Sequence, residues 1–338
     1  MSQRHTPPEP YAGQALNGRA ATSLRVGVIG AGRVGGVLAA ALRNAGFEIA
    51  MVAGESVESR SRIGALLPGV PVGKPTAVAR SCDLLLLTVP DDMLSNVVTM
   101  LAASGAIRRG QYVAHTSGKH GLAVLAPATE IGAHGLALHP VMTFTGTAVD
   151  LDRLPGCVYG VTAEPATAAL AEELVSELDG SIVRVPEDRR TLYHAGLAHG
   201  ANHLITLVAQ AMDLLAASGA EDPAAMLRPL LTAALDNALD SGDAALTGPI
   251  VRGDVETVRA HLAEILENAP GTLESYVAMA RATANRAVLD GRLLPIRAAK
   301  LVGVLNDALA LWSGREAQPV REVPVDEAQP VRVRRRRG

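Results

Sequence analysis

Short continuous apolar runs recur through the first half of the chain, and stretches with helical spacing separate them. The runs that we interpret as strands cover residues 24–30, 48–54, 83–90, 111–117, 135–140, 157–162 and 181–188. The helical candidates between them include residues 33–46, 59–67 and 91–104. Strands that are apolar along their whole length and alternate with helices are typical of a parallel sheet covered on both faces. The pattern therefore predicts an α/β domain with a doubly wound, mostly parallel sheet over residues 23–187.

The second half of the chain lacks such runs and is rich in Ala and Leu. Helical stretches cover about 189–218, 222–240, 254–268, 271–290 and 295–312, and turn or cap residues separate them. The pattern predicts an all-helical second domain over residues 188–313. Residues 1–22 and 314–338 are polar and proline-containing, and they predict disordered tails. The second tail ends in a basic tip, Arg332 and Arg334 to Arg337, which we interpret as solvated.

Composition narrows the class of protein and its compartment. Apolar residues make up 48% of the 338 positions, and the net charge of −3 argues against nucleic-acid binding by the chain as a whole. The two cysteines, Cys82 and Cys157, lack the spacing of a zinc site or a disulfide framework. The longest apolar runs fall far short of the roughly 18 residues of a membrane span. Residues 1–22 lack the apolar segment of a signal peptide, so we expect a cytoplasmic protein.

A glycine-rich loop follows the first predicted strand. Gly30, Gly32 and Gly35 have the spacing G-x-G-x-x-G, with Arg33 and Val34 between them, and a helical stretch follows. In this strand–loop–helix context the first glycine allows a tight turn and the second lets the backbone approach a pyrophosphate. The third lets the helix pack close to the strand, and the helix N-terminus favours a phosphate. The loop predicts a dinucleotide site.

The choice between NAD and NADP depends on residues after the second strand. Glu55 is placed to accept hydrogen bonds from both ribose hydroxyls, which favours NAD. Arg60 and Arg62 could instead hold a 2′-phosphate, which favours NADP, and the sequence leaves both cofactors open. Val89 and Pro90, at the end of the third apolar run, are expected to border the cofactor. Two acids follow, Asp91 and Asp92, which we interpret as helix N-caps rather than catalysts.

Candidates for chemistry lie after two later strands. Ser117 and Gly118 belong to the segment HTSGKHG, and His139 begins the segment HPVMTFTG. Because ligands of open α/β sheets bind at the carboxyl ends of the strands, both segments fall where chemistry is expected. The Ser117 hydroxyl could orient a carbonyl or carboxylate, and His139 could transfer a proton near neutral pH. The alternatives are a serine that bonds its own turn and a structural histidine.

The stretch Leu192–Leu204 carries three histidines and one asparagine on a predicted helix. At about 100° per residue, Asn202, His199 and His203 lie roughly 80°, 140° and 180° from His194, so one face cannot present all four. No glutamate completes a zinc motif, and we expect no metal. We expect Asn202 to face the cleft in which the substrate binds, with His194 or His199 beside it. The alternative is a helix whose polar groups are satisfied at a domain interface.

A last motif, TGPIVRGD, lies in the helical half. Asp254 is expected to be the N-cap of the next helix, and Arg252 could pair with a substrate carboxylate. A surface arginine in a loop is the alternative for Arg252.

Together these motifs resemble one family. The segments are VGVIGAGRVGGVLAAAL, DLLLLTVPDD, HTSG, LHPVMTF, LYHAGLAHGANHL and TGPIVRGD. They are similar to bacterial Rossmann-like oxidoreductases whose helical C-terminal half is a domain of unknown function, over roughly residues 24–310. These proteins lie within the 6-phosphogluconate-dehydrogenase-like superfamily. The resemblance implies a Rossmann fold, a nicotinamide cofactor and a homodimer formed through the helical domain. Some relatives are linked to pantothenate synthesis, which implies a small carboxylate-bearing substrate such as a ketopantoate-like 2-oxo acid.

The chain differs from some members of that superfamily at the position of their catalytic lysine, and this difference changes which residue is expected to be the general acid. β-Hydroxyacid dehydrogenases and ketopantoate reductases carry a lysine four residues before the helix asparagine, where this chain has Ala198. Prephenate dehydrogenases instead use a serine and a histidine that Ser117 and His139 resemble. The resemblance thus implies a histidine as the general acid, and the sequence leaves open whether it is His139 or His194. Ser117 and Asn202 are the other expected catalytic residues. Gly118, His199 and Arg252 are expected near the substrate. The alternatives are a prephenate or arogenate dehydrogenase, or a dinucleotide-binding redox sensor without catalysis.

Overall fold

The computed structural model describes residues 20–316, and these residues form two compact units. The first unit ends at Asn202 and the second begins at His203. The sequence pattern placed this boundary earlier, near residue 187, where the last strand ends. The helix after that strand belongs with the sheet because its side chains pack on the sheet's edge, as described below.

The predicted tails are only partly within the described residues. Most of both tails, and the basic tip with them, lies outside residues 20–316. At their inner ends the prediction of disorder is wrong. Ala21–Ser23 form the 3-10 turn η1, in which buried Ala21 donates its N–H to the Glu173 carboxylate at 2.8 Å. Helix α14 (Pro295–Glu316) continues past Gly314, since one glycine does not end a helix of 22 residues.

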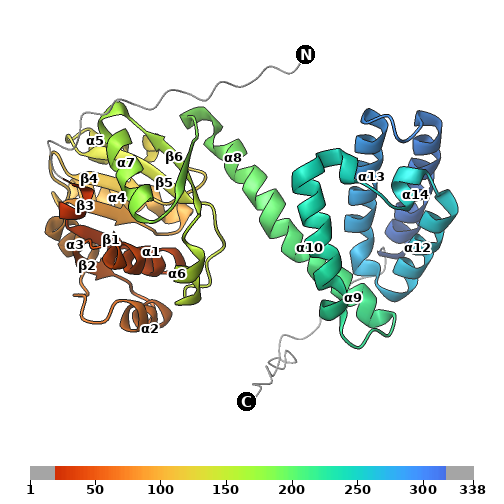
Figure 1. The fold of residues 1–338 in the computed structure, drawn as a ribbon, viewed down its shortest axis with the longest axis horizontal. Helices are drawn as coiled ribbons and strands as arrows, with labels where there is room; N and C mark the ends of the chain where they lie inside the picture. Colours follow the sequence, from red (N-terminus) through yellow and green to blue (C-terminus); the bar gives the residue numbers. More distant parts are fainter. Residues whose placement is uncertain (1–19, 317–338) are drawn as a thin grey trace. The chain divides into compact units, whose positions relative to one another are not determined.

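The first unit is built on one seven-stranded sheet in the order β2-β1-β3-β4-β5-β6-β7 (Figure 1). The strands are β1 (Val26–Ile29), β2 (Ile49–Ala53), β3 (Leu84–Leu87), β4 (Tyr112–His115), β5 (His134–Pro140), β6 (Val158–Ala163) and β7 (Ser181–Arg184). Every neighbouring pair is parallel except β5 and β6. The predicted doubly wound, mostly parallel sheet is confirmed.

Helices cover both faces of this sheet (Figure 1). They are α1 (Arg33–Asn44), α2 (Val57–Leu66), α3 (Pro75–Ser81), α4 (Asp91–Ala103), α5 (Ala126–Thr129), α6 (Val149–Arg153) and α7 (Pro165–Glu177), with the 3-10 turn η2 (Leu122–Leu125). Helix α8 (Arg190–Leu197) follows the 3-10 turn η3 (Glu187–Arg189) and begins at the edge of the sheet. The four leucines of β3 show why both faces need cover. Leu84 and Leu86 enter the core cluster on one face, and Leu85 and Leu87 enter the cluster on the other. Side chains alternate along a strand, so an unbroken apolar strand must be buried on both sides.

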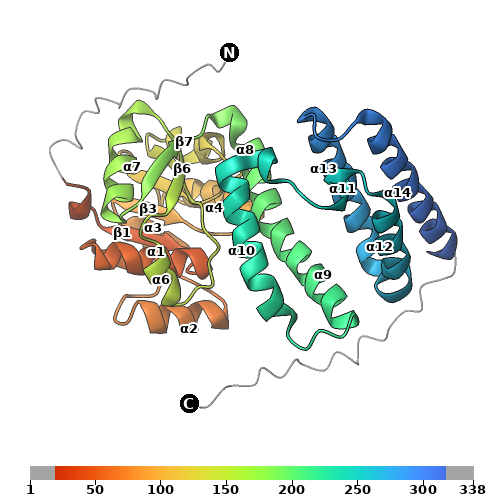
Figure 2. The same cartoon turned by 45° about the vertical axis from the view of Figure 1, so that its right-hand side comes forward.

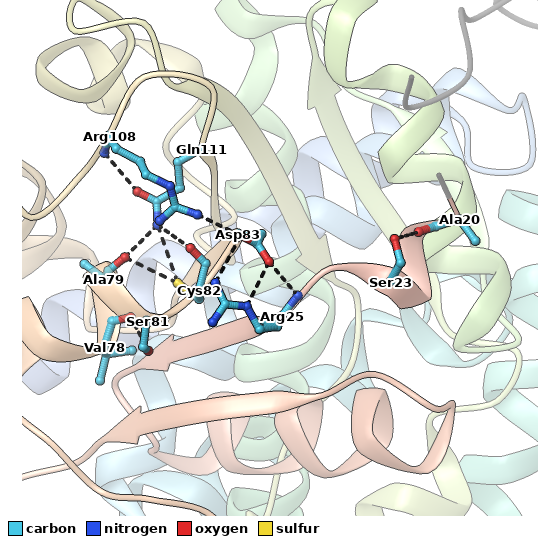
Figure 3. A network of polar contacts seen from close by, with 10 residues as sticks. All are labelled: Ala20, Ser23, Arg25, Val78, Ala79, Ser81, Cys82, Asp83, Arg108 and Gln111. Carbon is cyan, nitrogen blue, oxygen red and sulfur yellow. Dashed lines mark hydrogen bonds and ion pairs between the residues drawn. The ribbon is translucent and has the colours of Figure 1, made fainter. Parts of the chain in front are cut away.

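A polar network ties the amino ends of three strands together (Figure 3). The Asp83 carboxylate, just before β3, pairs with Arg25 before β1 at 3.2 Å and with Arg108 at 2.7 Å. The buried Gln111 amide, just before β4, donates to the carbonyl of Cys82 at 3.0 Å. Cys82 and Cys157 are both free and buried. This edge of the sheet is closed by its own side chains, so ligands are expected at the opposite, carboxyl edge.

The second unit is entirely helical over its described residues. It contains α9 (His203–Ala217), α10 (Pro223–Ser241), η5 (Gly242–Ala245), α11 (Pro249–Arg252), α12 (Val255–Asn268), η6 (Pro270–Thr272), α13 (Leu273–Leu289) and α14. Its core is formed by α11 to α14, with Leu262, Val277 and Leu305 almost fully buried. Helices α9 and α10 lie side by side (Figure 2), yet α9 buries no residue and α10 buries only Leu227. No helix among residues 20–316 combines the length and apolar character needed to cross a membrane.

The helix predicted over residues 189–218 is interrupted. A π-helical turn, η4 (Ala198–Asn202), separates α8 from α9. A π-turn holds more residues than an α-turn, so side chains beyond it are rotated relative to those before it. The predicted angles between His194, His199, Asn202 and His203 are therefore wrong, because they assumed about 100° per residue throughout.

The Asp83 network generates a prediction about stability. Burial raises the pKa of the Asp83 carboxyl, but the hydrogen bonds and charge of Arg25, together with the charge of Arg108, bring its net pKa below the usual value. Because the folded pKa is lowered, the stabilisation is present at neutral pH and is lost as the pH falls through that lowered pKa. We expect Asp83→Asn to lower the free energy of unfolding by about 1 kcal/mol at pH 7.

Urea denaturation at pH 7 measures this difference, and a repeat at a pH below the carboxylate's titration range should remove it. Asp188→Asn is the matched control, since Asp188 pairs with Arg189 at 3.3 Å on the surface, where both side chains are more than 60% exposed. Equal losses in the two variants would contradict a special role for the Asp83 network.

Candidate active site

Two glycines of the loop after β1 are dictated by close packing. Gly30 has φ of 97°, in the left-handed region, and a Cβ there would lie 2.8 Å from the backbone of Thr88. A Cβ on Gly35, in the first turns of α1, would collide with the Thr88 hydroxyl and with the carbonyl oxygen of Gly30. The Thr88 hydroxyl itself donates to the Gly30 carbonyl at 2.7 Å. The tight turn and the close helix–strand packing predicted for these glycines are both present.

Gly32 differs from its two neighbours because the space beside it is open. Its Cβ would have a single neighbour, the Gly30 carbonyl oxygen, at 3.7 Å. Gly32 is also the N-cap of α1, and it has no side chain that could accept the N–H groups of the first turn, which begins with Arg33 and Val34. That turn contains no acidic residue. Backbone N–H groups beside open space, next to Arg33, fit a pyrophosphate.

The two arginines considered for cofactor choice have different surroundings. Arg60 donates to the backbone carbonyl of Glu55 at 3.1 Å, so it stays beside the end of β2. Arg62 donates its Nε–H to the carbonyl of Gly146 at 3.0 Å, and its stem lies against Gly36 of α1. The structure therefore keeps Arg60 and Glu55 together at the predicted ribose position and anchors Arg62 to the loop after β5.

The segment after β3 borders the glycine loop. The amide nitrogen of Val89 lies 2.8 Å from where a Gly30 Cβ would be. Pro90 is the N-cap of α4, and Asp91 and Asp92 are the first two residues of that helix. The prediction that these acids are N-caps is wrong by one position, because Pro90 already has the extended backbone of the cap. In the first turn they still favour the helix through its dipole.

A second set of residues meets at the carboxyl end of β5. His139 pairs in register with Gly160 of the antiparallel strand β6. The hydroxyl of Tyr193, from α8, occupies the space where a Gly160 Cβ would be. The His139 Nδ1 atom and the Tyr193 hydroxyl are hydrogen-bonded at 2.8 Å, with their rings edge to face. Gly160 thus makes room for a tyrosine that the sequence analysis did not select.

His194 approaches the same histidine from the next position of α8. The rings of His139 and His194 are 6.1 Å apart and nearly perpendicular. A Cβ on Gly118 would lie 2.6 Å from Cδ2 of His194 and 3.0 Å from Nε2 of His139. Three of the predicted site residues therefore meet, and the loop after β4 can approach both imidazoles only with a glycine at position 118.

Ser117 adopts the alternative role of a turn residue. Its hydroxyl accepts from the N–H of His120 at 3.0 Å, and its own N–H donates to Nδ1 of His115 at 3.2 Å. His115 is fully buried, and its Nε2 bonds the Gly121 carbonyl at 2.9 Å. These bonds shape the HTSG turn. The predicted catalytic role of Ser117 stays a prediction, and it requires the remaining donor capacity of its hydroxyl.

Arg190 is the second residue that the sequence analysis missed. It is 1% exposed, and its guanidinium donates to the Ser117 carbonyl at 2.7 Å and to the Thr162 hydroxyl at 2.9 Å. Within residues 20–316 its Nε has no hydrogen-bond partner. Its Cζ lies 5.8 Å from the centre of the Tyr193 ring. Arg190, Tyr193 and His194 are three and four positions apart, a spacing that places them on one helix face and that the sequence does contain.

Burial and charge determine the protonation state of the cluster. Burial, with smaller contributions from the charge of Arg190 and from His194, lowers the pKa of His139 to about 4. His139 is therefore neutral near pH 7. Burial raises the pKa of Tyr193, and the charge of Arg190 offsets part of that rise. A neutral imidazole can donate a proton from one nitrogen and accept one at the other.

The remaining predicted residues lie elsewhere. His199 and Asn202 are in the π-helical turn η4, and Asn202 is exposed. Arg252 ends helix α11 in the second unit. Asp254 is the predicted N-cap, and its carboxylate accepts from the N–H of Thr257 at 3.2 Å. Among residues 20–316, no three His, Cys, Asp or Glu side chains are grouped in a way that could hold a metal ion.

Comparisons with family models agree with the resemblance inferred from the motifs. Residues 11–140 match a Rossmann-like domain, and residues 157–283 match a domain of unknown function, DUF2520. A search of curated proteins finds no match.

Solved structures share the fold at low sequence identity. A candidate NADP oxidoreductase from Bacteroides fragilis is 19% identical, with a TM-score of 0.67 over 79% of this chain and 100% of that chain. An imine reductase from Myxococcus stipitatus in complex with NADP+ is 15% identical, with a TM-score of 0.53 over 85% and 94%. Pyrroline carboxylate reductase from Plasmodium falciparum, with NADP bound, is 12% identical, with a TM-score of 0.52 over 84% and 98%. At these identities the likeness establishes the fold alone.

The glycine geometry generates a prediction about the protein without any ligand. Gly35→Ala should lower the free energy of unfolding by about 1–3 kcal/mol, since its Cβ collides with Thr88 and the backbone of Gly30. Gly32→Ala should leave the stability within about 0.5 kcal/mol, since among residues 20–316 its Cβ would meet only the Gly30 carbonyl oxygen, at an unstrained 3.7 Å. Chemical denaturation of both variants measures the difference. Equal destabilisation would show that the loop is packed differently.

Proposed function

We propose that this chain, which joins a Rossmann-like domain to the helical domain DUF2520, is a nicotinamide-dependent oxidoreductase. Its substrate is a small carboxylate-bearing carbonyl or hydroxy compound, with a ketopantoate-like 2-oxo acid favoured. The observation that carries the proposal is the meeting of His139 and His194 over Gly118. This meeting lies at the carboxyl edge of the same sheet whose glycine loop begins α1. Ligands of doubly wound sheets bind at that edge.

The first unit contains residues for both tasks of such an enzyme. Gly32, Arg33 and Val34 would hold the pyrophosphate, with Gly30, Gly35, Val89 and Pro90 shaping the pocket and Glu55 and Arg60 at the ribose. A bound nicotinamide supplies or accepts the hydride. His139 then donates a proton from Nε2 to the carbonyl oxygen, and His194 helps to orient that oxygen. We keep Ser117 and Asn202 as candidate catalytic residues, and His199 and Arg252 as candidate substrate contacts.

Two observations favour NADP as the cofactor. The solved structures described above are of an NADP oxidoreductase candidate or contain NADP, and Arg60 lies beside Glu55. If Arg60 holds a 2′-phosphate, Arg60→Ala should raise the Kd of NADPH at least tenfold and leave that of NADH within threefold. Arg62→Ala is the control, because Arg62 is anchored at Gly146. Calorimetric titration with both dinucleotides separates the outcomes. Glu55→Ala weakening NADH alone would instead assign the site to NAD.

The direct test of the function is turnover by the purified protein. NADPH and NADH oxidation is followed against a panel of 2-oxo acids that includes ketopantoate, and NAD(P)+ reduction is followed with prephenate and arogenate. We expect a 2-oxo acid to be reduced, and His139→Ala to lower its rate about 10²–10⁴-fold with dinucleotide binding retained. Turnover of prephenate or arogenate would favour the alternative dehydrogenase. Tight dinucleotide binding without turnover of any compound would favour a redox sensor.

A homodimer is part of the proposal, and exposed apolar side chains of the helical unit support it. On α9 and α10 these include Ile205 (65% exposed), Leu230 (63%) and Leu239 (77%). Apolar side chains gathered on one pair of helices are typical of a surface that pairs with another subunit. Sedimentation equilibrium should give twice the chain mass of 35.0 kDa. A monomer at micromolar concentration would contradict this part of the proposal.

A further inference from the structure

We propose that Tyr193 is a positioning residue that relays a proton through His139 to the substrate oxygen, an inference that rests on the proposed oxidoreductase function. The relay leaves Tyr193 as a phenolate, and the buried Arg190 guanidinium offsets its negative charge. The relay deepens the proposed function by assigning the source of the proton. Two observations support the relay: the hydrogen bond between Tyr193 and His139, and the surroundings of the Arg190 guanidinium.

The two nitrogens of His139 face different neighbours. Nδ1 is hydrogen-bonded to the Tyr193 hydroxyl at 2.8 Å. Nε2 faces Gly118, at 3.0 Å from where that residue's Cβ would be. When Tyr193 donates to Nδ1, the neutral ring carries its proton on Nε2 and offers it on the side of Gly118 and His194. The ring can then pass a proton along without becoming a buried cation.

The proton balance of a reduction follows from this arrangement. The carbonyl carbon gains the hydride from the reduced nicotinamide named in the proposed function, and the C=O π electrons move to the oxygen. The oxygen takes the proton from Nε2 as Nδ1 takes the proton from the Tyr193 hydroxyl. The imidazole ends neutral with its proton on Nδ1, and Tyr193 ends as a phenolate. The starting state returns when Nδ1 gives its proton back to the Tyr193 oxygen and Nε2 takes a proton from water. In an oxidation the same transfers run in reverse.

Arg190 supplies the charge that makes a buried phenolate tolerable. It is 1% exposed, and its bonds go to neutral acceptors, the Ser117 carbonyl and the Thr162 hydroxyl, with a longer contact to the Gly160 carbonyl at 3.4 Å. The nearby Glu187 carboxylate accepts instead from the N–H groups of Leu122 and Ala123, at 2.7 and 3.0 Å.

No ion pair of Arg190 is present among residues 20–316, and its Nε has no partner. The carboxylates of Glu187 and Asp91 act on Arg190 through their charge without an ion pair to it, and a buried cation is costly unless an opposite charge pairs with it closely. A negative charge that forms on the Tyr193 oxygen during the reaction would meet that requirement, since Arg190 Cζ lies 5.8 Å from the Tyr193 ring centre.

The chain offers a matched control for the tyrosine. Tyr276 and His261 form a second tyrosine–histidine pair, with the hydroxyl 2.9 Å from Nδ1 and the rings nearly perpendicular. This pair lies within the second unit, on helices α12 and α13. Tyr193→Phe and Tyr276→Phe each remove one hydroxyl from a tyrosine–histidine pair, and only the first touches His139.

The first arm of the test needs no substrate. ¹⁵N NMR of histidine-labelled protein, with His139 assigned through His139→Gln, should show His139 with its proton on Nε2 near pH 7. Tyr193→Phe should shift the Nδ1 resonance of His139, whereas Tyr276→Phe should shift only that of His261. A His139 with its proton on Nδ1, or one unaffected by Tyr193→Phe, would overturn the relay.

The second arm measures the single-turnover rate of the hydride step with the 2-oxo acid that the wild type turns over. Tyr193→Phe should lower this rate about 10²–10⁴-fold and leave the Kd of NADPH within threefold, with Tyr276→Phe like wild type. A rate within threefold of wild type in Tyr193→Phe would overturn the relay. No turnover by the wild type would overturn the proposed function instead, and the NMR arm would still decide the proton position.

Discussion

The rest of the candidate site depends on the hydrogen bonds made by the buried guanidinium of Arg190. It joins the first residue of α8 to the turn after β4, through the Ser117 carbonyl, and to β6, through the Thr162 hydroxyl. A buried charge that lost these acceptors would cost several kcal/mol, so the helix start is held firmly at this edge. Tyr193 and His194, one turn further along α8, are thereby brought to His139.

Glycines make room for the side chains that Arg190 brings to this edge of the sheet. Gly160 leaves the space that the Tyr193 hydroxyl fills, and Gly118 lets the loop after β4 approach both His139 and His194. The same logic holds at the cofactor loop, where Gly30 and Gly35 are required by packing and Gly32 borders open space. These five glycines of the first unit are therefore needed for different physical reasons. Gly160 and Gly118 permit side-chain contacts in the candidate site, Gly30 and Gly35 permit close packing in the loop, and Gly32 leaves room for a ligand.

Much of this could be predicted from the sequence, because the signals are local. Each strand is a continuous apolar run, the glycine loop has fixed spacing, and His139 follows a strand on the expected edge. Other features depend on contacts between distant segments. Arg190 looks like a surface residue at a helix start until β6 and the HTSG turn supply its acceptors. Ser117 looks like a free hydroxyl until the turn brings the His120 N–H to it. The π-helical turn at Ala198–Asn202 changes the phase of the helix, which a constant angle per residue does not anticipate.

In the proposed function, the loop after β1 binds a dinucleotide for a reaction at the same edge of the sheet. Titration calorimetry of NADPH and NADH into wild type, Gly32→Val and Gly303→Val tests it most directly. Gly303, in helix α14, has open space around its Cβ position and serves as a remote control. We expect saturable binding of one dinucleotide per chain by wild type and Gly303→Val, with a Kd at least tenfold higher in a folded Gly32→Val. Absence of binding by wild type, or binding that Gly32→Val leaves unchanged, would contradict it.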